Sequence, residues 1–210
     1  MNVRTQCGFT LWELMIAVAV AGIVLGLGVP SFKEFMRNSS MTSAANDLVA
    51  GVLLARAEAV KRQVPVTLCA SPDPTASSPE CDGSGSNGGF IVFVDDDDDG
   101  VSETSDGNAE VDTGEQVLLR REKPGGAINV WIEGGDYVSY GANGFKRHAT
   151  SQANDSATRV LYCDDRGNKD RGGLSTARVV LIDWTGRAQV LTSPDDVSDA
   201  AGAISGADCP

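Results

Sequence analysis

At 210 residues, the chain has room for one domain of moderate size together with one membrane helix. Its 29 acidic residues outnumber its 17 basic ones, and the net charge of −12 opposes non-specific binding to nucleic acid or anionic lipid over the whole surface. The single histidine, His148, is accompanied by no catalytic-triad, metal-protease or phosphate-loop motif, so we expect no enzymatic activity.

An apolar run near the N-terminus is the first organised feature. Residues 14–32 read LMIAVAVAGIVLGLGVPSF and carry no charge, which is about the length that a helix needs to cross a bilayer. The run is too long for a secretory signal, and no small-residue cleavage site follows it. A short polar leader with one charge, Arg4, precedes it. We therefore expect a membrane helix that stays in the mature protein.

Glu13 lies at the leading edge of this run. An ionised acid in hydrocarbon costs several kcal/mol unless it is paired, and Glu13 has no basic residue one helical turn away. One interpretation places it at the interface of a plain membrane anchor. The other pairs it with a new N-terminal amine at Phe9, created by cleavage after Gly8 and belonging most usefully to a neighbouring chain.

The stretch GFTLWELMIAVAVAGIVLGLGVPSF closely resembles the type III signal of type IV pilins and type II secretion pseudopilins. The resemblance implies that a prepilin peptidase cuts after Gly8 and methylates the new N-terminus at Phe9. It also implies that Glu13 neutralises the amine of the adjacent subunit during assembly. Residues 31–69 are similar to the GspH/FimT type of minor pilin, above all in LARAEAVKR at residues 54–62.

Helical periodicity resumes directly after Pro30, which favours a kink within one long helix over a helix end at that point. We expect the helix to end near Gln63, because Pro65 disfavours helical geometry just before it. Apolar residues at spacings of three and four predict a stripe that packs on a sheet. The stripe comprises Phe32, Phe35, Met36, Ala45, Leu48, Val49, Val52, Leu53 and Val60.

Beyond Pro65, short β-type runs alternate with segments rich in Gly, Asp, Asn and Pro. With no second long helix pattern, the fold class is α+β: one long N-terminal helix packed on an antiparallel sheet or on two small sheets. Segments 71–89, 142–157 and 193–208 are predicted loops or tail. The aromatic residues Trp131, Tyr137, Tyr140 and Trp184 are expected in the core or on a sheet face. The predicted strands are residues 66–70, 90–94, 116–121, 127–133, 137–140, 159–162, 178–183 and 187–191.

Four cysteines remain once Cys7 has left with the leader. An even number in an exported domain suggests two disulfides, which four cysteines can form in three ways. We favour Cys69–Cys81 and Cys163–Cys209, because each closes a local loop or tail. Zinc is disfavoured, since no closely spaced cysteine pair is present.

An acidic run follows the second predicted strand. Asp95, Asp97, Asp99 and Gly100 match D-x-D-x-D-G, the first half of a calcium loop, and Asp106 falls at the twelfth position, where an acid would close the site. The alternative is a solvated acidic turn without a ligand. No cofactor is required by either interpretation, and calcium is the metal for which the sequence offers ligands.

Some FimT-like minor pilins bind DNA through a basic G-R-x-R motif, which this chain resembles at residues 186–189. Arg187 matches the motif, whereas Gln189 replaces its second arginine. The other candidate basic residues are interleaved with acids and are read as solvated loop charge, so DNA is a disfavoured partner. They are Lys146, Arg147, Arg166, Lys169 and Arg171.

The resemblance therefore implies a minor pilin with a cleaved leader at residues 1–8, a transmembrane and assembly helix at 9–32, its amphipathic continuation at 33–63 and a β-rich periplasmic domain at 64–210. The precursor would cross the inner membrane once, meet the prepilin peptidase, and join other minor and major pilins in a pilus at the cell surface. The alternatives are a type II secretion pseudopilin and a DNA-binding pilin for natural transformation.

Overall fold

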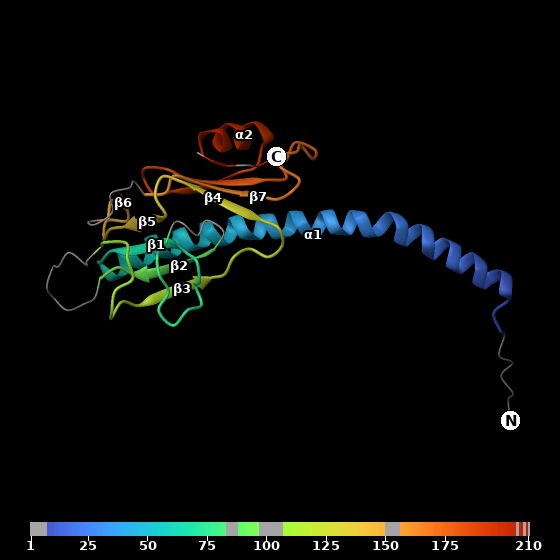
Figure 1. The fold of residues 1–210 in the computed structure, drawn as a ribbon, viewed down its shortest axis with the longest axis horizontal. Coiled ribbons are helices and arrows are strands. Elements are labelled where there is room, and N and C mark those ends of the chain that lie inside the picture. Colours follow the sequence, from blue (N-terminus) through green and yellow to red (C-terminus); the bar gives the residue numbers. More distant parts are fainter. Residues whose placement is uncertain are drawn as a thin grey trace, which may run out of the picture. The chain divides into compact units, whose positions relative to one another are not determined.

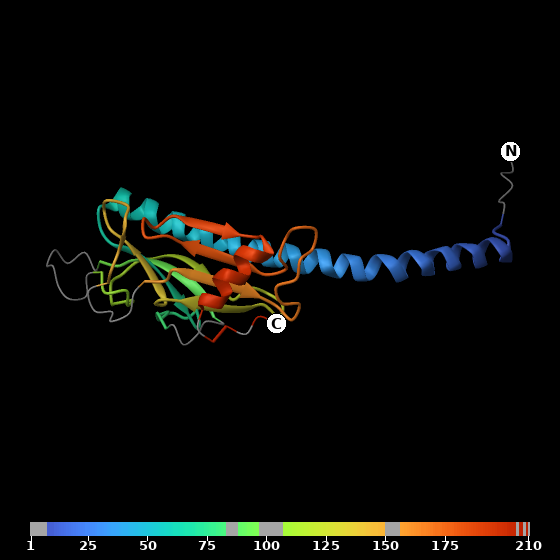
Figure 2. The same ribbon diagram turned by 90° about the horizontal axis from the view of Figure 1, so that it is seen from above.

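Figure 1 and Figure 2 show the computed structural model, which describes residues 8–82, 88–96, 107–149, 156–204, 206–207 and 209. The chain divides into two compact units, Met1–Ser39 and Ser40–Pro210. The first unit holds the start of helix α1 (Leu11–Arg62). The second holds the rest of α1, two sheets and helix α2 (Pro194–Ala203). The α+β class predicted from the sequence is confirmed.

Helix α1 continues through Pro30 and ends at Arg62, so the prediction of one long helix with an end near Gln63 is confirmed. Gln63 donates its backbone N–H to Ala59 O at 2.9 Å and has a φ of 64°. A residue in this left-handed conformation commonly follows the last turn of a helix. Pro65 then cannot continue the helix, and the chain passes directly into the first strand.

The strands of the second unit pair antiparallel and form two sheets. The eight predicted strands are all present, with bounds that differ by one or two residues. The first sheet has the order β3 (Val117–Arg121), β2 (Gly89–Val94), β1 (Val66–Ser71), β5 (Tyr137–Tyr140), β6 (Lys146–Arg147). The second has the order β4 (Asn129–Glu133), β7 (Arg159–Cys163), β8 (Arg178–Ile182), β9 (Ala188–Leu191).

One hydrophobic core joins both sheets to the part of α1 that belongs to the second unit. In Figure 1 this part of α1 lies between β4 and β7 on one side and β1 and β2 on the other. Alternate residues of each strand serve opposite faces: on β7, Val160 and Tyr162 belong to the core with α1, whereas Leu161 and Cys163 pack with α2. The second unit, Ser40–Pro210, which we call the globular unit, is therefore layered, and α1 contributes one of its layers.

The face of α1 that enters the core differs from the predicted stripe. The buried apolar side chains of the helix are Met41, Ala44, Ala45, Leu48, Val52, Ala55 and Ala59. Leu53 and Val60 are 56% and 45% exposed, because each lies one position, about 100°, beyond a buried residue. Phe32, Phe35 and Met36 are also exposed and belong to the first unit. Four of the buried positions are alanine, which lets the helix backbone approach the sheets closely.

Helix α2 corrects the prediction that residues 193–208 form an irregular tail. Ser193 caps the helix, since its Oγ accepts the Asp196 backbone N–H at 3.2 Å, and Pro194 occupies the first turn, where its missing N–H costs nothing. Val197, Ala200 and Ile204 are buried against the second sheet. Ser193 and Pro194 are local signals of a helix start, but the small polar residues around them are also typical of a loop.

The predicted loop 142–157 also needs correction, because it contains strand β6, two residues long and paired with β5. Such a short edge strand leaves no periodic signature in the sequence. Tyr137 and Tyr140 are buried as predicted, and Trp131 packs against the cluster under α2. Trp184 contradicts the prediction of a core or sheet-face residue, because it is 83% exposed.

Candidate functional site

The start of α1 is built around Thr10 and Glu13. Thr10 caps the helix: its Oγ1 accepts the Glu13 backbone N–H at 3.2 Å, and its carbonyl accepts the Leu14 N–H at 3.1 Å. Glu13 is thus the third residue of the first turn, where a negative charge is favoured by the helix dipole. Thr10 lies beyond the predicted cleavage point at Gly8, so cleavage there would leave the cap intact.

The part of α1 in the first unit exposes large apolar side chains on every side. A window of 18 residues has a mean hydropathy of 2.3 and no buried residue, which is long and apolar enough to cross a membrane by length and composition. Phe9 beside it is 84% exposed. The exposed large apolar residues of this part of the helix are Leu11, Trp12, Leu14, Met15, Ile16, Val18, Val20, Ile23, Val24, Leu25, Leu27, Val29, Phe32, Phe35 and Met36. A surface of this kind requires lipid or other protein as its surroundings.

Two disulfides fasten the globular unit. Cys69 on β1 is bonded to Cys81, which closes the loop that follows this strand. Cys163 at the end of β7 is bonded to Cys209, beyond α2. These are the two pairings favoured from the sequence. Each disulfide attaches a segment that has few apolar residues to a strand: the loop after β1 in one case and the C-terminal tail in the other.

Asp95 is an internal residue of the globular unit. Its side chain is fully buried; its Oδ2 accepts hydrogen bonds from Thr67 Oγ1 at 2.5 Å and from the Ala109 backbone N–H at 3.1 Å. Burial raises the pKa of Asp95 to about 6, against the opposing effect of these hydrogen bonds and of the Arg147 charge. The Asp95 carboxylate therefore links the start of the acidic run both to Thr67 on β1 and to the backbone at Ala109, which follows the run. Asp97, Asp99 and Asp106, the other predicted calcium ligands, lie outside the described residues, so calcium binding stays a prediction.

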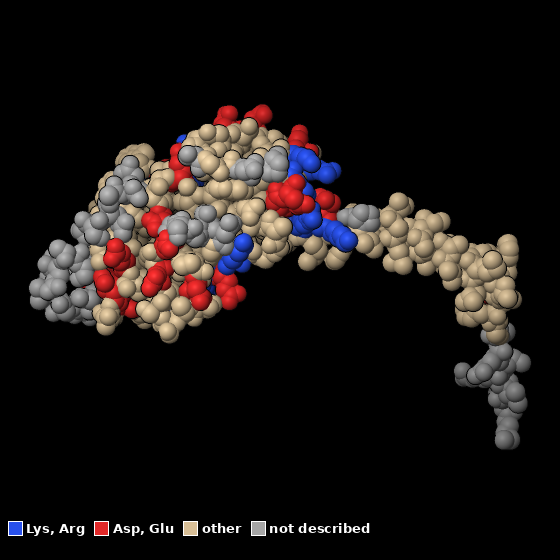
Figure 3. Space-filling view, in the orientation of Figure 1, with Lys and Arg blue, Asp and Glu red and all other residues tan. Residues whose placement is uncertain are grey.

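The candidate basic residues do not gather into one patch. Arg166 is buried and bonded through its Nε to the Asp164 carboxylate at 2.9 Å, and Lys146 Nζ donates to Ala157 O at 2.8 Å. Arg187 is exposed on the turn between β8 and β9. Figure 3 shows acids spread over the visible face of the globular unit with basic residues among them. The arrangement offers no continuous basic surface on that face, and DNA binding stays a disfavoured prediction.

The β8–β9 turn is held by a dense set of hydrogen bonds. Asp183 Oδ1 accepts the backbone N–H groups of Thr185 at 2.8 Å and Arg187 at 2.9 Å, together with the Thr185 hydroxyl at 2.6 Å. These hydrogen bonds, first of all that from the Thr185 hydroxyl, hold the pKa of Asp183 below its usual value. The turn is consequently rigid although it lies at the surface.

Gly186 attaches the same turn to Tyr140 of β5. Its φ of 77° favours glycine, and a side chain there would collide with the ring of Tyr140. The Tyr140 hydroxyl donates to Gly186 O at 2.6 Å. Trp184 is left projecting from the turn, and its indole has no hydrogen-bond partner within the described part of the chain.

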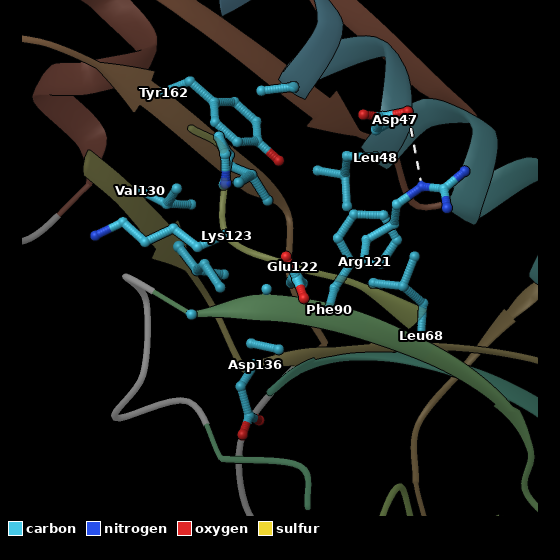
Figure 4. A pocket seen from close by; sticks show the side chains of 18 of the residues that line it. Asp47, Leu48, Leu68, Phe90, Arg121, Glu122, Lys123, Val130, Asp136 and Tyr162 are labelled. Atoms are coloured by element: carbon cyan, nitrogen blue, oxygen red, sulfur yellow. Dashed lines mark ion pairs between the residues drawn. The ribbon is translucent and has the colours of Figure 1, made fainter. Parts of the chain in front are cut away.

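A cavity of about 290 Å³ opens between the two sheets beside the first turns of α1 in the second unit (Figure 4). We call it the inter-sheet cavity. Its apolar wall is formed by Leu48, Leu68, Phe90, Val130, Ile132, Val138, Val160 and Ile182. The Tyr162 hydroxyl points into it, and burial raises the pKa of this phenol above its usual value. The rim carries both charges: Asp47 and Arg121 are 3.8 Å apart, and Glu122, Lys123 and Asp136 lie nearby.

Comparison with known families decides what kind of protein these features belong to. The model of the type II transport protein GspH matches residues 44–186, which is more than half of the chain. The chain belongs to the GspH family. The model of the prokaryotic N-terminal methylation motif matches residues 3–29 of this GspH-family chain. The resemblance to pilins and pseudopilins seen in the sequence is confirmed, and pilins are structural proteins.

Known relatives of the GspH-family chain include pilins. It is 33% identical over 63 residues to the type IV major alpha-pilin of Moraxella bovis. The matched region is 30% of this chain and 40% of that pilin. It is 38% identical over 48 residues to fimbrial protein Q of the same species, with coverages of 23% and 31%. The chain thus spans 40% or less of these relatives. The solved type IV minor pilin FimU of Pseudomonas aeruginosa is 19% identical, with a TM-score of 0.44 over 75% of this chain and 92% of that one.

Three features of the GspH-family chain were not predicted from its sequence. The cap at Thr10 could have been found, because Thr-x-x-Glu before an apolar run is a helix-start signature. The exposure of Trp184 could not, since an aromatic residue next to a strand usually faces a core. The inter-sheet cavity also has no sequence signal, because it depends on how the two sheets diverge.

Proposed function

We propose that this GspH-family chain is a minor pilin, trimmed by a prepilin peptidase after Gly8 and methylated at Phe9. Helix α1 then carries it into a type IV pilus or its priming complex. The observation that carries the proposal is the start of α1: a capped helix with one acid in its first turn and exposed apolar residues all round it. The methylation motif at residues 3–29 supports the processing step.

The electrostatics of this helix start explain why an acid is needed. Cleavage after Gly8 would leave the amine of Phe9 one residue before the Thr10 cap, next to the positive end of the helix dipole. Glu13 offers the opposite charge within the first turn, and in a bundle of such helices it can meet the amine of an adjacent subunit. Pairing removes the cost of an isolated charge in an apolar environment.

The location follows from the same features. The first part of α1 would cross the inner membrane as a single span, with the globular unit on the periplasmic side. Disulfides persist in an oxidising compartment such as the periplasm, and the two in this unit fit that side of the membrane. The partners would be minor and major pilins with helices of the same kind.

Two substitutions separate processing from assembly. In cells with the peptidase, mass spectrometry should find a mature chain that begins at methylated Phe9, and a Gly8→Leu variant should keep its leader. Glu13→Ala should be cleaved normally but should appear in sheared fibres at least tenfold less, because the amine is left unpaired. Glu34→Ala, an acid further along α1, serves as the matched control. Normal incorporation of Glu13→Ala would contradict the pairing mechanism.

A type II secretion pseudopilin is the second candidate, favoured by the match to a type II transport protein over residues 44–186. The helix start would act in the same way in either assembly. Deletion of the gene distinguishes the two: loss of surface pili with normal protein secretion supports the minor pilin. Loss of secretion with normal piliation would support the pseudopilin.

A further inference from the structure

The globular unit carries two apolar features that it does not satisfy itself. One is the inter-sheet cavity, which has about 290 Å³ of space beside apolar side chains. The other is Trp184, which at 83% is the most exposed of the described large apolar residues in this unit. Both belong to Ser40–Pro210, so their relation is fixed by one set of strands.

The cavity has the size and chemistry of a socket for one aromatic side chain. A cavity of about 150 Å³ is enough to hold benzene, so this one has room for the two rings of an indole. The Tyr162 hydroxyl points into the cavity and offers an acceptor to an indole N–H. Buried indoles usually find such a partner.

The turn that carries Trp184 is suited to act as the inserted element. Asp183 and Gly186 hold its backbone, so little conformational freedom is lost when the indole becomes buried. A second hollow beside Trp184 has only polar lining residues apart from the indole, among them Ser156 and Thr158. The indole therefore has no apolar site there.

The strands place the cavity mouth and Trp184 at opposite ends of β4 and β8, although the cavity itself extends as far as Ile182. β4 and β8 run in the same direction, because each pairs antiparallel with β7 between them. The cavity rim at residues 123–125 precedes the start of β4, whereas Trp184 follows the end of β8. Five strand residues separate the two ends, about 17 Å. Trp184 and the cavity mouth of its own chain thus lie at different ends of these strands.

We propose that Trp184 of one copy of this chain inserts into the inter-sheet cavity of a second copy. The contact joins different surfaces, so each copy keeps a free cavity at one end or a free indole at the other, and repetition gives an open head-to-tail row. Charge adds to the fit, because Arg187 lies beside the indole and acids outnumber basic residues at the rim: Asp47, Glu122 and Asp136 against Arg121 and Lys123. The inference goes beyond the proposed function, because it names a self-contact of the globular unit that does not involve Glu13.

The test uses the full chain in membranes, with the photoreactive residue p-benzoylphenylalanine at position 184. Illumination should give a covalent dimer, and mass spectrometry should place the adduct on the second copy among residues 121–132. The same photoreactive residue at Leu174, which is 50% exposed, is the matched control and should give no adduct at the cavity. Glu13→Ala should leave the dimer unchanged, which separates this contact from helix assembly.

A rim substitution asks whether the cavity itself receives the indole. Gly125 lies at the rim, and a Cβ there meets nothing within 4 Å, so Gly125→Phe blocks the mouth without a clash. It should reduce the dimer at least tenfold. Gly202→Phe, at an equally open position on α2, should not.

The affinity gives a second readout. In detergent micelles, Trp184→Ala should weaken self-association roughly 30-fold, the change expected for an anchor tryptophan that contributes about 2 kcal/mol. Leu174→Ala should have no such effect. The proposal is overturned by any of four outcomes: no dimer, an adduct outside the cavity, an adduct on another pilin or on lipid, or a dimer that persists in Gly125→Phe.

Discussion

Replacing Asp95 by asparagine should change how stability depends on pH. The folded protein binds the Asp95 proton more tightly than the unfolded chain, since burial raises the pKa to about 6 from an ordinary value near 3.8. The stability that this group contributes is therefore fully present at low pH and is lost as pH rises through about 6. The asparagine side chain would keep an oxygen for the Ala109 N–H and would not titrate.

The size of the effect follows from the two pKa values. Between pH 7 and pH 5, the wild-type chain should gain about 1 kcal/mol of unfolding free energy relative to Asp95→Asn. Asp73→Asn is a control, since the pKa of Asp73 shifts in the opposite direction. Hydrogen bonds from Thr75, that of its hydroxyl first, lower the pKa of Asp73 from 3.8, so the stability due to Asp73 is lost only as pH falls below about 3.8 and should not change between pH 7 and pH 5.

Urea unfolding of the full chain in a nonionic detergent measures both differences. Trp131 packs in the cluster under α2, so its fluorescence reports loss of the globular unit. Subtracting the variant from the wild type at each pH removes the contributions of all other titrating groups. A difference between wild type and Asp95→Asn that stays flat from pH 7 to pH 5, as that for Asp73→Asn should, or that falls, would mean that the bonds from Thr67 and Ala109 outweigh burial, and the reasoning would be refuted.

Three further substitutions address packing and capping. Met41→Ala should lower the unfolding free energy by about 2–5 kcal/mol, whereas Met36→Ala, at a 49% exposed position, should change it little; urea unfolding compares them. Tyr140→Phe should cost roughly 1 kcal/mol, because Gly186 O loses its hydroxyl donor, and should increase amide exchange in the β8–β9 turn. Ser193→Ala should cost about 1 kcal/mol through the loss of the α2 cap, seen as faster exchange in the first turn of that helix.

The strands were predictable because their pattern is local. Residues 90–94 and 159–162 are short apolar runs bounded by turn residues, and these boundaries fixed β2 and β7 to within a residue or two. The division into two sheets was left open, since pairing depends on contacts between residues far apart in the chain. The same limit applies to the inter-sheet cavity, whose wall combines residues of both sheets and α1.

The wrong predictions, for α2 and for Trp184, have other causes. α2 is short and rich in small and acidic residues, so its two buried side chains, Val197 and Ala200, gave too weak a period to outweigh the composition. The prediction of a core or sheet-face position for Trp184 was wrong, although aromatic residues beside a strand are usually buried. Its exposure follows from the turn, where Asp183 and Gly186 fix the backbone so that the side chain between them points outward.

Helix α1 shows how one helix can meet two different surroundings. From Met41 to Ala59 only one face is buried, and alanines on that face allow close packing on the sheets. Before Ser40 the large apolar residues lie on all sides, and none of those described is covered by the chain itself. A stripe can be satisfied by one sheet, but a helix that is apolar all round needs surroundings on every side. Within the described part of this chain that requirement is unmet, and the proposed function meets it with lipid before assembly and with neighbouring helices after it.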